Sequence, residues 1–213
     1  MNQTLSICLA TVESRAKLFA LLHGELMVKT IGKPVELVVY CDNKEISIGK
    51  KRQELMERAT GEYVVFIDDD DWVAPTYVDD ILQALTTKPD CVGFEIECTT
   101  NGRDKQSAIA SMRYKRWSDN LDGYRFNRST YHKTPIRRDL ALKVGFPNLR
   151  YAEDKYFSEG IIKLVETEVF IPKVLYYYRF NSEPFAQKYG FKNGPSEPKT
   201  THRKLDNKGR KMG

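Results

Sequence analysis

The sequence predicts one α/β domain with a largely parallel central sheet, and three observations support this prediction. Apolar runs of strand length alternate with segments of helical periodicity over the first hundred residues. Two of these runs, 35–41 and 63–67, are almost wholly apolar, as in strands that are covered on both faces. The length of 213 residues fits a single hydrophobic core.

The first half of the chain predicts four strands with three helices between them. The strands are short apolar runs, and we expect them at 5–9, 35–41, 63–67 and 91–98. The helices show apolar residues at helical spacing or terminal Gly and Pro signals, and we expect them at 13–27, 50–59 and 75–85. This order gives βαβαβαβ, which is typical of a parallel sheet.

The second half is less regular. Residues 99–129 are polar, basic and aromatic, and their pattern favours no particular structure. After them we expect a strand, a short helix, a longer helix and one or two strands, at 130–136, 138–144, 153–163 and 169–180. The expected domain covers 1–185, in two halves, 1–102 and 103–185. Residues 186–213 are rich in Lys, Gly and Pro and predict a basic, flexible tail that orders on binding.

Composition limits the class of protein. No apolar run approaches the ~18 residues of a membrane span, and no positive segment precedes the first apolar run, so we expect neither integral membrane association nor a secretory signal. The four cysteines lie in strand-like runs without metal-type spacing, which favours reduced thiols and a cytoplasmic protein.

The net charge of +5 is unevenly distributed. Residues 103–150 carry twelve Lys and Arg against four Asp, and residues 186–213 carry eight against two acidic residues. The rest of the chain is therefore acidic. This division predicts one part that holds a cation and another that meets an anion.

Four consecutive aspartates follow the third predicted strand, at the end where α/β sheets bind ligands. Hard divalent ions such as Mg²⁺ and Mn²⁺ prefer carboxylate oxygens. Alternate residues of an extended segment point the same way, so we expect Asp68 and Asp70 to converge on a metal while Asp69 and Asp71 face elsewhere. The alternative is a solvated acidic turn or a helix N-cap.

The segment that contains these aspartates resembles the signature of family 2 glycosyltransferases, which have the GT-A fold. In that family a G-x-x-R-N segment and a G-E-Y precede the D-x-D metal motif, and the corresponding residues are 49–53, 61–63 and 68–70. The resemblance spans roughly residues 4–180. It departs from the family at Gln53, where Asn is usual, at 10–12, where Ala-Thr-Val replaces Pro-Thr-Tyr, and in having only Asp42 after the second strand.

The resemblance implies a donor site for a nucleotide-sugar, most simply a UDP-sugar. Asp42 would contact the base and Asp68 the ribose, while Asp70 would bind the Mn²⁺ or Mg²⁺ that bridges the diphosphate. The other donor-binding residues implied by the resemblance are Thr11, Glu13, Arg52 and Asp69. Arg52 has a rival interpretation as a helix-surface residue paired with Glu.

A second carboxylate pair, Glu153-Asp154, begins the helix expected at 153–163. Helix N-termini favour carboxylates, so capping is an alternative explanation. By the resemblance, however, the pair is similar to the E-D motif that supplies the catalytic base. Asp154 would be that base, Glu153 would position the acceptor, and the transfer would invert the anomeric centre.

Cations and aromatic residues alternate over 112–117 and 124–128, in the half that receives the acceptor in this family. Cations match phosphate, and exposed rings can stack on bases. We therefore expect an anionic acceptor, with DNA that carries a hydroxymethylated base as leading candidate, as for a viral enzyme acting in the host cytoplasm. The expected acceptor-binding residues are Trp72, Arg113, Lys115, Arg116, Trp117 and His132. His202, in the tail, is a candidate metal ligand.

The sequence also admits other acceptors and other functions. The acceptor alternatives are a surface polysaccharide and a lipid-linked glycan. A nucleotidyltransferase would usually carry a glycine-rich phosphate loop near the N-terminus, and residues 10–15 contain no glycine. A nucleic-acid-binding module with an inactive acidic site is the alternative without catalysis.

Overall fold

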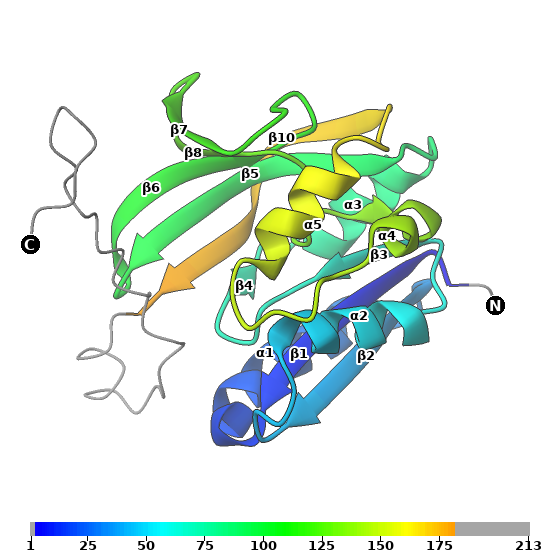
Figure 1. The fold of residues 1–213 in the computed structure, drawn as a ribbon. Coiled ribbons are helices and arrows are strands. Elements are labelled where there is room, and N and C mark those ends of the chain that lie inside the picture. Colours follow the sequence, from blue (N-terminus) through cyan, green and yellow to red (C-terminus); the bar gives the residue numbers. More distant parts are fainter. Residues whose placement is uncertain (1–2, 182–213) are drawn as a thin grey trace, which may run out of the picture. The chain divides into compact units, whose positions relative to one another are not determined.

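The first three strands pair in parallel within a ten-stranded mixed sheet (Figure 1). The computed structural model describes residues 3–181. β1 pairs in parallel with β2 on one side and with β3 on the other, so β1 is an interior strand. The strands are β1 (Leu5–Val12), β2 (Val35–Asp42), β3 (Tyr63–Phe66), β4 (Trp72–Val73), β5 (Cys91–Thr100), β6 (Arg103–Ala110), β7 (Ser118–Leu121), β8 (Tyr124–Arg128), β9 (Ile136–Arg137) and β10 (Glu168–Phe180).

Helices cover both faces of the sheet, as the all-apolar strands predicted. They are α1 (Ala16–Thr30), α2 (Ile48–Arg58), α3 (Tyr77–Leu85), α4 (Arg138–Val144) and α5 (Glu153–Ile161), and a 3₁₀ turn (Glu13–Arg15) precedes α1. One core packs α1 and α3 against the sheet, and the other packs α2, α4 and α5. In the second core Phe146 and Phe157 stack with ring centroids 4.2 Å apart.

The second half of the sheet is more mixed than the sequence indicated. β5 and β10 run parallel, whereas β6 and β9 run antiparallel to β5. Residues 99–129, whose sequence pattern favours no particular structure, include β6, β7 and β8. The strand expected at 130–136 is wrong over most of its length, because a turn in which Thr134 N–H donates to Tyr131 O interrupts it, and β9 begins only at Ile136.

Helix boundaries agree with the predictions to within a few residues. α4 covers the predicted range, while α3 begins at Tyr77, two residues after Pro75. Between residues 3 and 181, no helix has the length and apolarity needed to cross a membrane. The predicted tail at 186–213, including His202, lies outside the described residues.

The parallel register brings the ends of the first three strands to one edge. Val12 at the end of β1 lies opposite Asp42 at the end of β2, and Cys8 lies opposite Phe66 at the end of β3. The aspartates that follow β3 therefore lie beside the loops that follow β1 and β2. The C-terminal end of β10 reaches the same place, because Arg179 N–H donates to Asp71. This edge holds the candidate site.

Candidate active site at the carboxyl edge of the sheet

The four aspartates form a turn, which changes how their side chains pair. Asp71 N–H donates to Asp68 O over 3.1 Å, so the segment reverses direction after β3 instead of continuing as a strand. Lys133 pairs with Asp68 and Asp71, while Arg15 pairs with Asp69 and Asp70. The backbone here is not extended, so the alternation rule does not apply to this segment, and the convergence of Asp68 and Asp70 on a metal stays a prediction.

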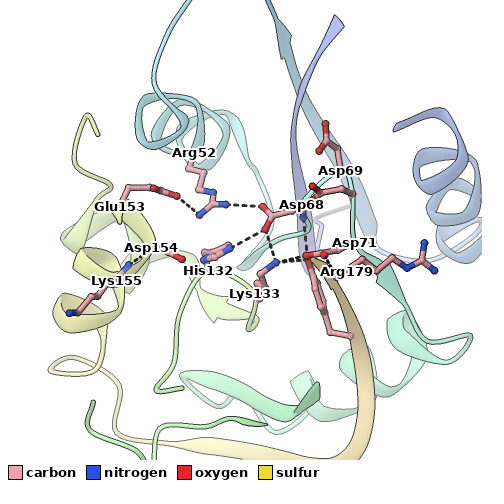
Figure 2. Close-up of polar contacts among 12 residues, drawn as sticks. Arg52, Asp68, Asp69, Asp71, His132, Lys133, Glu153, Asp154, Lys155 and Arg179 are labelled. Carbon is pink, nitrogen blue, oxygen red and sulfur yellow. Dashed lines mark hydrogen bonds and ion pairs between the residues drawn. The ribbon is translucent and has the colours of Figure 1, made fainter. Parts of the chain in front are cut away.

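Asp68 is held by two cations (Figure 2). Its Oδ1 lies 2.7 Å from Arg52 Nη2, and its Oδ2 lies 2.6 Å from Lys133 Nζ. Burial opposes ionisation of this carboxyl, but Lys133 and Arg52 outweigh burial and hold the pKa of Asp68 well below its usual range. Asp68 is therefore ionised at neutral pH.

Asp71 is buried and fastens the turn to the last strand. One carboxylate oxygen accepts from the Tyr176 hydroxyl over 2.6 Å and pairs with Lys133 Nζ. The other accepts from Arg179 N–H over 2.9 Å. With these partners Asp71 has no oxygen directed to solvent, so its role is to join the turn, the loop around Lys133 and β10.

Asp69 and Asp70 share the guanidinium of Arg15 but differ in their surroundings. Asp69 lies 2.5 Å from Arg15 Nη1 and also accepts from the Thr11 hydroxyl over 2.7 Å. Asp70 lies 3.1 Å from the same nitrogen, and its side chain is 30% exposed. Burial and the neighbouring Asp71 raise the pKa of Asp70 to about 7 despite Arg15. Asp70 is thus the least compensated carboxylate of the turn.

Helix α2 carries two buried cations to this edge. Lys51 Nζ pairs with Asp42 and donates to Thr11 O over 3.3 Å. Arg52 is 5% exposed and bridges Asp68 and Glu153, over 2.7 and 2.8 Å. The interpretation of Arg52 as a helix-surface residue is therefore wrong, since both of its partners lie beyond its own helix.

The two carboxylates at the start of α5 differ strongly. Glu153 is 5% exposed and paired with Arg52, and burial raises its pKa against the effect of that cation. Asp154 is partly exposed, forms no ion pair with any described residue, and accepts only the Lys155 N–H, over 2.8 Å. Its carboxylate points to the side of α5 that faces His132 (Figure 2). Of the pair, Asp154 is free to accept a proton.

A divalent ion fits this site if a ligand supplies most of its coordination. Six carboxylates, Asp68–Asp71, Glu153 and Asp154, gather with three paired cations, Arg15, Arg52 and Lys133. Over residues 3–181, no three His, Cys, Asp or Glu side chains are placed to hold a metal by themselves. Mg²⁺ commonly binds through one or two carboxylates plus substrate phosphates. Asp70, under-compensated and partly exposed, fits such a ligand.

The other predicted donor residues lie around the same edge. Thr11 is buried beside Asp69, and Glu13 is exposed in the 3₁₀ turn. Asp42 accepts two backbone N–H groups of its own loop in addition to pairing with Lys51. Trp72, expected to meet the acceptor, lies in β4 directly after the turn, with the Arg179 guanidinium 5.2 Å from its ring centroid.

The predicted acceptor residues are not all brought to the site. Arg113 lies over Phe170, which pairs with β5 six positions before the pairing of Arg179, and so lies roughly 20 Å from the end of β10 that contacts the acidic turn. Trp117 donates its indole N–H to Ser158 and packs edge-on against Tyr131, so its ring is not an open stacking surface.

Lys115 and Arg116 are exposed between Arg113 and Trp117. His132 is 2% exposed, with its Nε2 3.7 Å from Asp68 Oδ2. Of the expected acceptor residues, His132 therefore lies deepest within the acidic site, beside Asp68, which the resemblance led us to expect at the donor.

Sequence reasoning missed Lys51, Lys133 and Tyr176. A signal existed for Lys51, because it lies four residues before the buried Leu55 and so falls on the apolar face of α2. Lys133 and Tyr176 lie 62 and 105 residues from Asp71, and no local pattern connects residues so far apart.

Comparisons with known proteins agree with this architecture. The model of glycosyl transferase family 2 matches residues 32–144. The Bacillus subtilis (strain 168) protein described as "Putative glycosyltransferase EpsH" is 25% identical over 166 residues, which cover 71% of this chain and 46% of that protein. This chain thus spans about half the length of that relative.

Two solved structures share the fold. S. aureus TarS 1-349 in complex with UDP-GlcNAc has a TM-score of 0.62 at 17% identity, over 84% of this chain and 59% of that one. The mannosyltransferase PcManGT of Pyrobaculum calidifontis, in complex with GDP-Man and Mn²⁺, has a TM-score of 0.50 at 15% identity, over 83% and 57%. These likenesses confirm the GT-A fold that the sequence predicted.

Proposed function

The chain belongs to glycosyl transferase family 2, and from that premise we propose that it is a metal-dependent, inverting glycosyltransferase. One observation carries the proposal. Among the described residues, the least compensated carboxylate of the acidic turn is Asp70, in the D-x-D segment, and the carboxylate of the E-D pair without an ion pair is Asp154. These are the two positions at which sugar transfer requires a metal ligand and a base.

The proposed donor is a nucleotide-sugar, with a UDP-sugar as the first choice because TarS was solved with UDP-GlcNAc. Asp42, Asp68 and Asp69 would bind it together with Thr11, Glu13 and Arg52. Asp70 would hold Mn²⁺ or Mg²⁺ against the diphosphate, and PcManGT was solved with Mn²⁺. When bound, the ion neutralises charge that develops on the leaving diphosphate.

The proposed transfer is a single displacement. Asp154 takes the proton of the acceptor hydroxyl as that oxygen bonds to the anomeric carbon, and the bond from this carbon to the diphosphate breaks. Attack on the face opposite the leaving group inverts the anomeric centre. Glu153 is neutralised by Arg52 and is less suited than Asp154 to accept the proton.

The proposed acceptor is anionic, and exposed Lys115 and Arg116 support this class. DNA that carries a hydroxymethylated base remains the first acceptor to test. Stacking of DNA bases on aromatic rings should contribute less to the affinity than the sequence suggested, since Trp117 and Phe126 pack against the core. A surface polysaccharide and a lipid-linked glycan complete the acceptor panel.

The decisive experiment measures nucleotide release from UDP-GlcNAc and GDP-Man with Mn²⁺, in the presence and absence of each acceptor. We expect turnover by the wild type, a loss of at least about 100-fold in Asp154→Asn, and metal-independent residual activity in Asp70→Ala. Nucleotide binding should survive in Asp154→Asn. A wild type that neither binds nor turns over any nucleotide-sugar would contradict the proposal.

A further inference from the structure

Helix α2 and its N-cap residue, Ser47, form three hydrogen bonds to the segment that leads into α5. Gly49 N–H donates to Leu149 O over 3.0 Å, and the Ser47 hydroxyl donates to Asn148 Oδ1 over 2.6 Å. One turn later, Gln53 Oε1 accepts from the N–H of Phe146 over 2.8 Å. These bonds fix residues 146–149, which precede the Glu153-Asp154 pair by only a few residues.

The same helix is fixed on its other side to the donor edge. Lys51 pairs with Asp42, at the end of β2, and Arg52 pairs with Asp68, just after β3. Arg52 also reaches Glu153, so one guanidinium spans both carboxylate groups. α2 therefore connects the donor carboxylates to the helix that carries Asp154.

Close packing at Gly49 sets the separation of α2 from the loop. A Cβ at this position would lie 1.9 Å from Pro147 O and 3.1 Å from Leu149 N, both backbone atoms that cannot rotate away. Only glycine allows this approach. The approach places the first turn of α5 within reach of Arg52.

We propose that α2 is a positioning element for sugar transfer, in which Gly49 and Gln53 set where Asp154 lies relative to the donor. The inference rests on the proposed function, since it assigns a role in that same reaction. Neither residue touches the reacting atoms; both act through residues 146–149 and the start of α5. A displacement of about 1 Å at a catalytic group typically costs ~100-fold in rate, so small changes in this packing have large effects.

The proposed test compares Gly49→Ala with Gln53→Met, and uses Gly24→Ala as the matched control. Gly24 lies on α1, and a Cβ there meets no atom within 4 Å. Donor hydrolysis with Mn²⁺ serves as the assay, because water then replaces the acceptor hydroxyl and needs the same base. Binding of UDP is measured in parallel by calorimetry.

For Gly49→Ala we expect kcat to fall about 30- to 100-fold while the affinity for UDP changes less than about 3-fold. The segment 147–149 has to shift away from the new methyl group, because α2 itself is held by the ion pairs of Lys51 and Arg52. Gln53→Met removes one hydrogen-bond acceptor, that of the Phe146 N–H, without adding a clash. We expect this variant to retain the fold and to lose about 5- to 10-fold in kcat. Gly24→Ala should match the wild type.

A double-variant comparison separates positioning from a general structural role. In an Asp154→Asn background there is no base to misplace, so Gly49→Ala should lower the residual rate by less than about 2-fold. Equal losses in both backgrounds, or parallel losses of UDP affinity and kcat, would overturn the positioning role alone. A wild type without any donor turnover would instead overturn the proposed function, and this inference with it.

Discussion

His132 is a buried histidine whose two ring nitrogens both lack a hydrogen-bond partner among the described residues. It lies between the Tyr131 ring, 4.9 Å away by centroid, and the Asp68 carboxylate. Burial, with a smaller effect from Arg52, lowers the pKa of His132 to about 4. The ring is therefore neutral at physiological pH and adds no cation to the site.

This burial predicts a measurable dependence of stability on pH. The unfolded chain protonates His132 near pH 6.5, whereas the folded protein does so only near 4, so stability rises with pH across this window and is lost as pH falls through it. The full effect is about 3 kcal/mol. We expect the unfolding free energy of the wild type relative to His132→Gln to fall progressively from pH 6.5 to 4.5 in urea titrations. A constant difference would refute a neutral His132.

The acidic turn joins three elements that are distant in sequence. Lys133 Nζ contacts Asp68, Asp71 and the Tyr176 hydroxyl, so the turn after β3, the loop before β9 and the end of β10 meet at one ammonium group. The Tyr176 ring centroid is also 4.5 Å from Nζ. All three N–H groups of this ammonium have a partner. The position of the Asp68 carboxylate therefore depends on Lys133.

Removing this ammonium should cost much of the stability of the fold. Lys133→Met leaves Asp68 and Asp71 without their shared cation, and breaking a buried pair on one side costs about 3–5 kcal/mol. Adding Asp71→Asn should recover part of the loss, because the amide still accepts from Tyr176 without burying a charge. Chemical denaturation of both variants checks this, and a single-variant cost under about 1 kcal/mol would contradict it.

The elements of the first half were predictable because their signals are local. All-apolar runs such as 63–67 marked buried strands, and the placement of the aspartates after one of them marked the edge of the sheet. Asp70 and Asp154 stood out through the family resemblance. Other features depend on contacts between residues more than 60 positions apart, which no periodicity in the sequence encodes. These features are the way the acidic turn is held, the pairing of β9 with β3, and the partners of Asp71.

At the scale of the whole molecule, the fold collects acidic side chains from the turn after β3 and from the start of α5, and cations from the 3₁₀ turn before α1, from α2 and from the loop before β9. The six carboxylates outnumber the three cations, which pair with five of them. Excess negative charge in a partly buried site destabilises it, since burial penalises ionised groups. We therefore expect an external cation to reduce this excess of negative charge when it binds.

This imbalance predicts that metal and nucleotide stabilise the protein together more than separately. A diphosphate alone meets repelling carboxylates, and Mn²⁺ alone finds chiefly Asp70, because the other aspartates of the turn are paired more closely. At concentrations about 100-fold above the dissociation constant, the pair should add ~2.7 kcal/mol. For a domain of this size that raises Tm by roughly 5–10 °C.

Thermal unfolding with UDP, Mn²⁺ and both together measures the effect. Asp70→Asn should abolish the synergy and retain any shift from UDP alone, whereas a full shift with UDP and EDTA would show that Arg15, Arg52 and Lys133 already balance the diphosphate without a metal.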